Sequence, residues 1–261
     1  MFDWDKRMKN ESETLASIFK KNKIKNLIDL GVWTGEYTIR LAKKLLCQIL
    51  GLDHNSLMIK LCEAKKEKLE PIIKKRVSFM LSDFTNLPNT INHKYDSAIC
   101  MGNALPYLPT IPIKLFKEVS SVLKNDGLII IQMLNLEKIL KTEDKLISFD
   151  IQKTQQNHQK EYLSLEFFDS KKQDDFLTHH IIIFDSDGEN WSFKGVTSIP
   201  VRYITKNDLE KALVQAGFAE IAISGSIGKY QNDYGELSFS KPFDVENDDF
   251  LNILAKKNNI I

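Results

Sequence analysis

The segment from Asp29 to Gly35, Asp-Leu-Gly-Val-Trp-Thr-Gly, places a carboxylate and two glycines directly after an apolar run. Glycine lets a backbone approach a ligand closely and adopt conformations that are closed to other residues. A loop of this kind between a strand and a helix is where a doubly wound sheet binds its cofactor. The sequence therefore predicts a cofactor loop here, although an ordinary structural turn would have the same residues.

Two later apolar runs also end in residues suited to a nucleotide. The run that ends in Gly51-Leu52-Asp53 places a carboxylate about 20 positions after the loop, where it can accept both hydroxyls of an adenosine ribose. The run that ends in Ser82-Asp83-Phe84 could hold an adenine by one polar contact and one stacked ring. Taken singly, Asp53 could be a helix N-cap and Asp83 could close a loop. Together, the three strand ends favour a cofactor with an adenosine group.

Short apolar runs alternate with helix-period segments between residues 27 and 134, as in strand–helix units around a parallel sheet. Strands are predicted over 26–30, 49–52, 77–81, 95–101 and 128–134, with helices over 36–46, 56–68 and 113–124. Right-handed crossovers between parallel strands place every carboxyl end on one edge of the sheet, and ligands bind at that edge. The residues described above should therefore lie close together.

The pattern changes after Leu140. Strand-like segments at 146–151, 161–169, 176–185 and 190–197 are joined by polar links that are typical of hairpin turns. We assign residues 141–200 to an inserted antiparallel meander, which is predicted to form a lid. Thr205 is the expected N-cap of a helix over 206–216, and strands are expected over 218–224 and 250–255. Residues 1–140 and 201–261 would then form the main domain.

The glycine loop, the ribose carboxylate and the Asp-Phe pair at successive strand ends resemble class I S-adenosylmethionine (SAM) methyltransferases. The segment from Gly102 to Leu108, Gly-Asn-Ala-Leu-Pro-Tyr-Leu, the turn Asn125-Asp126-Gly127 and Asn135 are similar to the glycine/sarcosine N-methyltransferase-like branch. The similarity is weakest in the insert. It implies an α/β fold: a Rossmann-like, seven-stranded, mostly parallel sheet with helices on both faces, plus the inserted antiparallel β cap.

The resemblance also implies roles for individual residues. Asp29 and the two glycines would surround the methionine part of SAM, and the N-terminal segment would act as a lid in which Arg7 holds the SAM carboxylate. Asp53 would bind the ribose, and Asp83 and Phe84 would line the adenine. The full set of cofactor-binding residues that it implies is Arg7, Asp29, Gly31, Trp33, Gly35, Asp53, Met58, Asp83, Phe84 and Met101.

The expected reaction is methyl transfer to a small-molecule acceptor, an amine nitrogen by preference. Because the methyl of SAM is already activated, the protein mainly has to align a lone pair and exclude water. Asn103, Tyr107 and Asn135 are predicted to contact the acceptor, with Asn103 and Tyr107 as the catalytic candidates. His179 and His180 are neighbours on a predicted strand, so only one of them can face a site; otherwise both lie on the sheet surface.

Two residues depart from the family pattern. Trp33 stands where the middle glycine of the loop is usual, so its indole must turn away from the cofactor or occupy part of its site. This leaves a non-catalytic SAM-binding or scaffold protein open as an alternative. Leu134 stands where glycine methyltransferases carry an arginine that pairs with the substrate carboxylate, which disfavours glycine itself as the acceptor.

Composition and motif content disfavour several other functional classes. The 36 basic and 35 acidic residues nearly cancel, which disfavours a nucleic-acid methyltransferase without eliminating it. The loop lacks the GxGxxG fingerprint of a nicotinamide dehydrogenase. Cys47, Cys62 and Cys100 are isolated, so no disulfide or metal site is expected. A charged N-terminus and the lack of a long apolar stretch predict a cytoplasmic protein that does not contact membranes.

Overall fold

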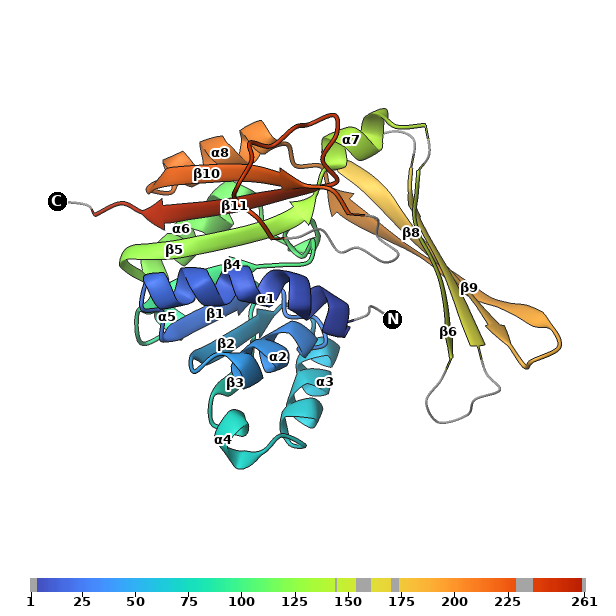
Figure 1. The fold of residues 1–261 in the computed structure, drawn as a ribbon, viewed down its shortest axis with the longest axis horizontal. Helices are drawn as coiled ribbons and strands as arrows, with labels where there is room; N and C mark the ends of the chain where they lie inside the picture. Colours follow the sequence, from blue (N-terminus) through green and yellow to red (C-terminus); the bar gives the residue numbers. More distant parts are fainter. Residues whose placement is uncertain (1–3, 144, 154–160, 170–173, 229–236, 260–261) are drawn as a thin grey trace.

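The computed structural model describes residues 4–143, 145–153, 161–169, 174–228 and 237–259, with the side chains of 4–10, 148, 152 and 153 outside the description (Figure 1). A seven-stranded sheet lies at its centre, in the order β10-β11-β5-β4-β1-β2-β3. Its strands are β1 (Asn26–Leu30), β2 (Gln48–Asp53), β3 (Val77–Leu81), β4 (Tyr95–Cys100), β5 (Leu123–Leu134), β10 (Phe218–Ser226) and β11 (Phe250–Lys257). The first five are parallel, and β11 runs antiparallel to both of its neighbours. The predicted fold class is confirmed.

Helices cover both faces of this sheet (Figure 1). They are α1 (Trp4–Lys21), α2 (Glu36–Lys44), α3 (Ser56–Lys66), α4 (Pro71–Lys74), α5 (Leu87–Thr90), α6 (Pro112–Val122), α7 (Leu136–Lys141) and α8 (Lys206–Gln215), with a 3₁₀ turn η1 (Leu105–Tyr107). Consecutive strand residues point to opposite faces, and Leu27 and Ile28 accordingly belong to two separate apolar clusters. Strands buried on both faces explain why the apolar runs are nearly continuous.

The helix termini follow local sequence signals. Thr205 caps α8 as expected: its hydroxyl accepts the Asp208 N–H at 3.1 Å, and the Asp208 carboxylate accepts the Thr205 N–H at 3.0 Å. This reciprocal pair satisfies two backbone donors that the helix itself leaves unpaired. None of the described helices is both long and apolar enough to cross a membrane.

The N-terminal segment, which was expected to act as a lid, forms the helix α1. Leu15 and Phe19, in its second half, are buried in the apolar cluster that also contains Leu41 of α2. That half of the segment is therefore part of the main domain's core.

Residues beyond α7 form a separate antiparallel sheet in the order β6-β7-β8-β9. Its strands are β6 (Leu146–Lys153), β7 (Glu161–Phe168), β8 (Phe176–Ser186) and β9 (Trp191–Arg202). Figure 1 shows this sheet projecting from the side of the molecule at which β5 ends. Its strand β9 contacts η1, which follows β4, and this contact places the second sheet beside the carboxyl edge of the first.

The last strand of this sheet extends beyond its predicted end at residue 197. It continues to Arg202 and includes Pro200, which lies opposite Thr178 of β8. Proline has no N–H to donate, so it is confined to edge strands, where one side needs no partner. Among the described strands, β9 is the edge of its sheet, which explains why the proline does not end it.

Candidate functional site

The loop between β1 and α2 depends on its two glycines. Gly31 and Gly35 have φ values of 75° and 74°, in the left-handed region that favours glycine. A Cβ atom on Gly31 would lie 2.8 Å from the Cβ of Ala104, and one on Gly35 would lie 2.9 Å from the Sγ of Cys62. The backbone and its neighbours therefore require glycine at both positions, and this requirement holds with or without a ligand.

Trp33 shares the left-handed backbone of this loop, with φ at 51°. Its N–H donates to Asp53 Oδ2 at 2.8 Å, and its carbonyl accepts the Cys62 thiol at 3.2 Å. The side chain is 54% exposed, so the indole is not buried within the loop. The backbone of Trp33 thus ties the loop to the end of β2.

The two carboxylates predicted to bind SAM are both buried at strand ends. Asp29 Oδ2 accepts the Thr38 hydroxyl at 2.5 Å. Asp53 receives the Trp33 N–H on one oxygen and the Asn55 N–H, at 2.9 Å, on the other. Asn55 is the N-cap of α3, which excludes that role for Asp53. Each carboxylate oxygen has two lone pairs, so each oxygen of Asp53 can accept a further hydrogen bond beside its backbone N–H; His54 Nδ1 lies 3.7 Å from Oδ1.

The end of β3 differs from the prediction at Phe84. Its backbone has a φ of 63°, and its side chain is 0% exposed among the residues of the larger apolar cluster. The expected stacking of Phe84 on an adenine is therefore wrong for this conformation. Asp83 is exposed, and its Oδ1 accepts the N–H and the hydroxyl of Thr85 at 2.9 and 2.8 Å. These bonds, that of the N–H first, lower the pKa of the Asp83 carboxyl.

The remaining cofactor candidates lie in different surroundings. Met101 is buried directly after β4, in the cluster beneath α1 and α2, whereas Met58 is half-buried on the first turns of α3. Arg7 belongs to α1, but its side chain lies outside the described residues. Its assigned contact with the SAM carboxylate stays a prediction.

Asn103 and Tyr107, the catalytic candidates, are brought together after β4. Asn103 has φ of 65°; its N–H donates to the Gln132 carbonyl and its Oδ1 accepts the Leu134 N–H, both at 3.1 Å. The Asn103 side chain lies beside the Tyr107 hydroxyl, and it partly offsets the rise that burial causes in the pKa of that hydroxyl. Asn103 thus joins the ends of β4 and β5 next to Tyr107, which is half-buried on η1.

Tyr107 reaches the second sheet through His179. The Tyr107 oxygen lies 2.9 Å from His179 Nδ1, and His179 Nε2 lies 3.4 Å from Glu166 Oε2 on the neighbouring strand β7. The adjacent His180 faces the other way and contacts Asp169 and Ser198 at 2.8 and 2.9 Å. The strand alternation predicted for the histidine pair is correct. Glu166 was missed, because no local pattern distinguishes it from other acidic strand residues.

Asn135, the third acceptor-binding candidate, has a structural role. Its Nδ2 donates to the Val245 and Asp248 carbonyls, both at 2.8 Å, and its Oδ1 accepts the Lys138 N–H at 3.1 Å to cap α7. The side chain is 3% exposed and both of its N–H groups are used. The prediction that Asn135 contacts the acceptor is therefore wrong.

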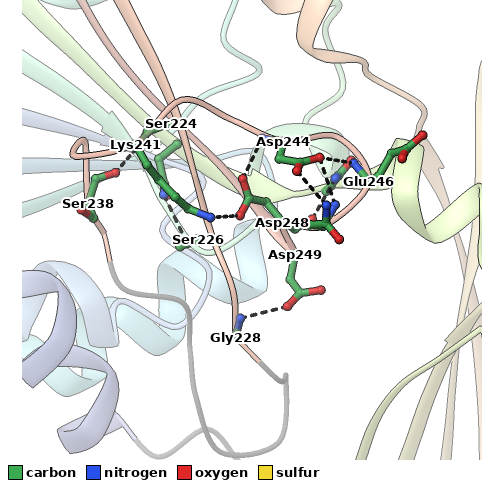
Figure 2. A network of polar contacts seen from close by, with 12 residues as sticks. Ser224, Ser226, Gly228, Ser238, Lys241, Asp244, Glu246, Asp248 and Asp249 are labelled. Carbon is green, nitrogen blue, oxygen red and sulfur yellow. Dashed lines mark hydrogen bonds and ion pairs between the residues drawn. The ribbon is translucent and has the colours of Figure 1, made fainter.

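The segment that Asn135 holds is part of the polar network of Figure 2, between β10 and β11. Asp248 lies at its centre with 0% exposure. Its Oδ2 accepts the Asp244 N–H at 2.8 Å, and its Oδ1 pairs with the ammonium group of Lys241. Because β10 ends and β11 begins beside the end of β5, this network shapes the same carboxyl edge.

Asn135→Asp is expected to lower the free energy of unfolding by roughly 2–3 kcal/mol although the two side chains have the same shape. A carboxylate would keep the cap on Lys138 but would face two carbonyl oxygens with an acceptor in place of a donor. Urea unfolding of the variant measures this loss. Unchanged stability together with weaker acceptor binding would restore the substrate role for Asn135.

The family model described as "Methyltransferase domain" matches residues 21–216. A glycine/sarcosine N-methyltransferase from Aphanothece halophytica is 25% identical over 142 residues, which are 54% of this chain and 52% of that protein. The chain thus spans about half the length of this curated relative. Two others, from Halorhodospira halochloris and Parasynechococcus marenigrum, are 25% and 22% identical over 142 residues each, with about the same shares covered.

The solved structures agree over nearly the whole chain. An S-adenosylmethionine-dependent methyltransferase from Clostridium acetobutylicum superposes with a TM-score of 0.67 at 20% identity, covering 96% of this chain and 92% of that one. The sugar N-methyltransferase KedS8 from a Streptoalloteichus species gives 0.67 at 13% identity, covering 96% and 87%. At these identities the structures support the fold alone. The family model spans most of the strand–helix units that position the glycine loop, and on that basis the chain belongs to the methyltransferase domain family.

Proposed function

We propose that this protein is a SAM-dependent methyltransferase that methylates an amine nitrogen of a small-molecule acceptor by in-line displacement. One observation carries the proposal. The hydrogen bond from the Trp33 N–H to Asp53 holds the glycine loop against this carboxylate at the carboxyl edge of the sheet. Membership of the methyltransferase family and the names of the similar N-methyltransferases support it. The likeness to the glycine/sarcosine enzymes covers about half of their length, so the acceptor itself is open.

Residues at three strand ends suit the ribose, the amino acid part and the adenine of SAM. The lone pairs left on Asp53 suit the two hydroxyls of a ribose, and the left-handed backbone at Gly31 allows a ligand to lie against the loop. The exposed carboxylate of Asp83 lies at the next strand end, on the adenine side of such a ligand. When bound, SAM would supply an activated methyl group.

The acceptor would enter between this edge and the second sheet. Tyr107 and Asn103 lie at the junction, and His179 links that junction to β8. We therefore propose that residues 141–200 form a lid that shapes the acceptor site and excludes water. Main-domain residues would be those of 1–140 and 201–261.

Titration calorimetry and thermal denaturation with SAM, S-adenosylhomocysteine (SAH) and NADH test the cofactor. Ligand that binds only the native state raises its stability by mass action, by about 2.7 kcal/mol at a concentration of 100 Kd. We expect heat and a higher melting temperature with SAM and SAH, and neither with NADH. Binding of NADH without binding of millimolar SAM would contradict the proposal, whereas SAM binding without turnover of any acceptor would favour the non-catalytic alternative that Trp33 raises.

A further inference from the structure

Three side chains from three elements form a continuous polar line between the two sheets. Tyr107 comes from η1, His179 from β8 and Glu166 from β7. The Tyr107 oxygen lies 2.9 Å from His179 Nδ1, and His179 Nε2 lies 3.4 Å from Glu166 Oε2. Among the described residues these are the titratable groups in contact with the His179 ring. The line begins at the candidate acceptor site and ends on the second sheet.

The direction in which a proton can pass along this line depends on the tautomer of His179. A neutral imidazole has one donor and one acceptor nitrogen. Transfer of the Tyr107 hydrogen to His179 requires Nδ1 to be the acceptor, 2.9 Å from the Tyr107 oxygen. In that tautomer Nε2 carries the hydrogen, which faces Glu166.

Burial makes His179 unlike a surface histidine. Its side chain is 6% exposed, and Nε2 is buried without a hydrogen bond to any described residue. The ring stacks on Phe168, with the centroids 4.8 Å apart and an interplanar angle of 22°. Buried polar atoms without a close partner are uncommon in native proteins and require an explanation. A positive charge formed on this ring would draw Nε2–H and the Glu166 carboxylate together.

We propose that Tyr107, His179 and Glu166 form a proton relay that converts an ammonium acceptor to its neutral amine before methyl transfer. The ammonium N–H bond breaks as an O–H bond forms at Tyr107, and the original Tyr107 hydrogen passes to His179 Nδ1. The resulting imidazolium is stabilised by Glu166 and later releases its proton to solvent. No atom is oxidised or reduced, and the amine retains the lone pair that attacks the methyl carbon. The relay rests on the proposed function and specifies a cationic amine as the acceptor.

The surroundings of Tyr107 explain why a relay is needed. Burial first, and then the negative charge of Glu166, raise the pKa of the Tyr107 hydroxyl above its usual value near 10. A free phenolate at this position would be costly to form. A hydroxyl that accepts one proton while it passes another to His179 never has to carry that charge. Tyr107 is thus the residue that touches the acceptor, and His179 and Glu166 act through it.

Neighbouring residues of the second sheet supply a matched control, with His180 on β8 and Asp169 directly after β7. His180 and Asp169 also form a histidine–carboxylate pair, with Nε2 and Oδ1 2.8 Å apart, on the opposite face from Tyr107. His180→Gln and Asp169→Asn therefore change the second sheet by equivalent substitutions without touching the relay.

Nitrogen NMR of the full-length protein, labelled with ¹⁵N-histidine and saturated with SAH, tests the relay without an acceptor. We expect neutral His179 to carry its hydrogen on Nε2, and Glu166→Gln to change the Nε2 chemical shift because the carboxylate that faces this nitrogen is lost. Asp169→Asn should change the ring resonances of His180 and leave those of His179 unchanged. Hydrogen on Nδ1 of neutral His179, or His179 ring resonances unaffected by Glu166→Gln, would overturn the proposal even if SAH binds.

The second measurement is the rate of methyl transfer. Methylamine, sarcosine and glucosamine serve as acceptor probes, and the release of SAH is followed. Glu166→Gln and His179→Gln should lower kcat by roughly 10²-fold or more where the amine is protonated, and by less as the pH passes the amine's own pKa. SAH affinity should be unchanged. Tyr107→Phe, which keeps the ring, should show the same profile. A loss that is equal at every pH would indicate a structural role and overturn the relay. If SAM and SAH do not bind, the proposed function fails; if they bind and no probe is methylated, the NMR result still decides the relay.

Discussion

Gly225→Ala is expected to lower the free energy of unfolding by roughly 3–5 kcal/mol. A Cβ atom at this position would lie 1.7 Å from Asp248 Oδ2 and 2.2 Å from Asp248 Cγ, so the buried carboxylate would have to move. That movement would separate Asp248 from the Lys241 ammonium group and the Asp244 N–H, which hold the loop before β11 (Figure 2). The Asp248 side chain is 0% exposed whereas that of Lys241 is 48% exposed, so the separated carboxylate would be the uncompensated charge in the interior.

Chemical denaturation followed by circular dichroism measures this effect, and Gly195→Ala is the matched control. Gly195 also lies in a strand, β9, but an added Cβ there has nothing within 4 Å. We expect the control to unfold at nearly the same urea concentration as the original protein. Equal midpoints for both alanine variants would show that the buried Asp248 network does not depend on Gly225.

Asp53→Ala is expected to weaken SAH binding by roughly 1.5–3 kcal/mol, or about 10- to 150-fold. The substitution removes the carboxylate proposed to accept two ribose hydroxyls. It also leaves the Trp33 and Asn55 N–H groups without their acceptor, so we expect a simultaneous loss of stability of roughly 1–3 kcal/mol. Calorimetry for SAH and urea unfolding separate the two effects.

Asp96→Ala controls for the structural part of that result. Asp96 also accepts two backbone N–H groups, those of Lys25 and Asn26, both at 2.8 Å, but it does so near the start of β4, at the opposite edge of the sheet. The Asp96→Ala variant should therefore be less stable than the original protein but bind SAH with unchanged affinity. An unchanged SAH dissociation constant in Asp53→Ala, or an equal weakening in both variants, would remove Asp53 from the proposed cofactor site.

Local sequence signals, such as apolar runs and helix caps, were sufficient to predict the architecture. The strands over Asn26–Leu30 and Val77–Leu81 have their predicted ends because their apolar runs stop abruptly at glycine or at polar residues. The first is a central, buried strand and the second is the partly exposed edge strand. Thr205 caps α8 because its partner Asp208 lies three residues away. The methyltransferase family follows from the same signals, since the glycine loop and the strand-end carboxylates occur at fixed places in a strand–helix repeat.

Side-chain direction at the carboxyl edge was decided only by the tertiary structure. The ring of Phe84, a predicted adenine contact, is instead 0% exposed in the apolar core. Asn135 donates hydrogen bonds to carbonyls of residues more than 100 positions later in the sequence. Tyr107 contacts His179, which lies 72 positions later. Periodicity and capping report only on neighbours within a few residues, whereas these contacts depend on which distant segment the folded chain brings alongside. The sequence by itself therefore determined the fold and the family, and packing determined which polar residues face a ligand.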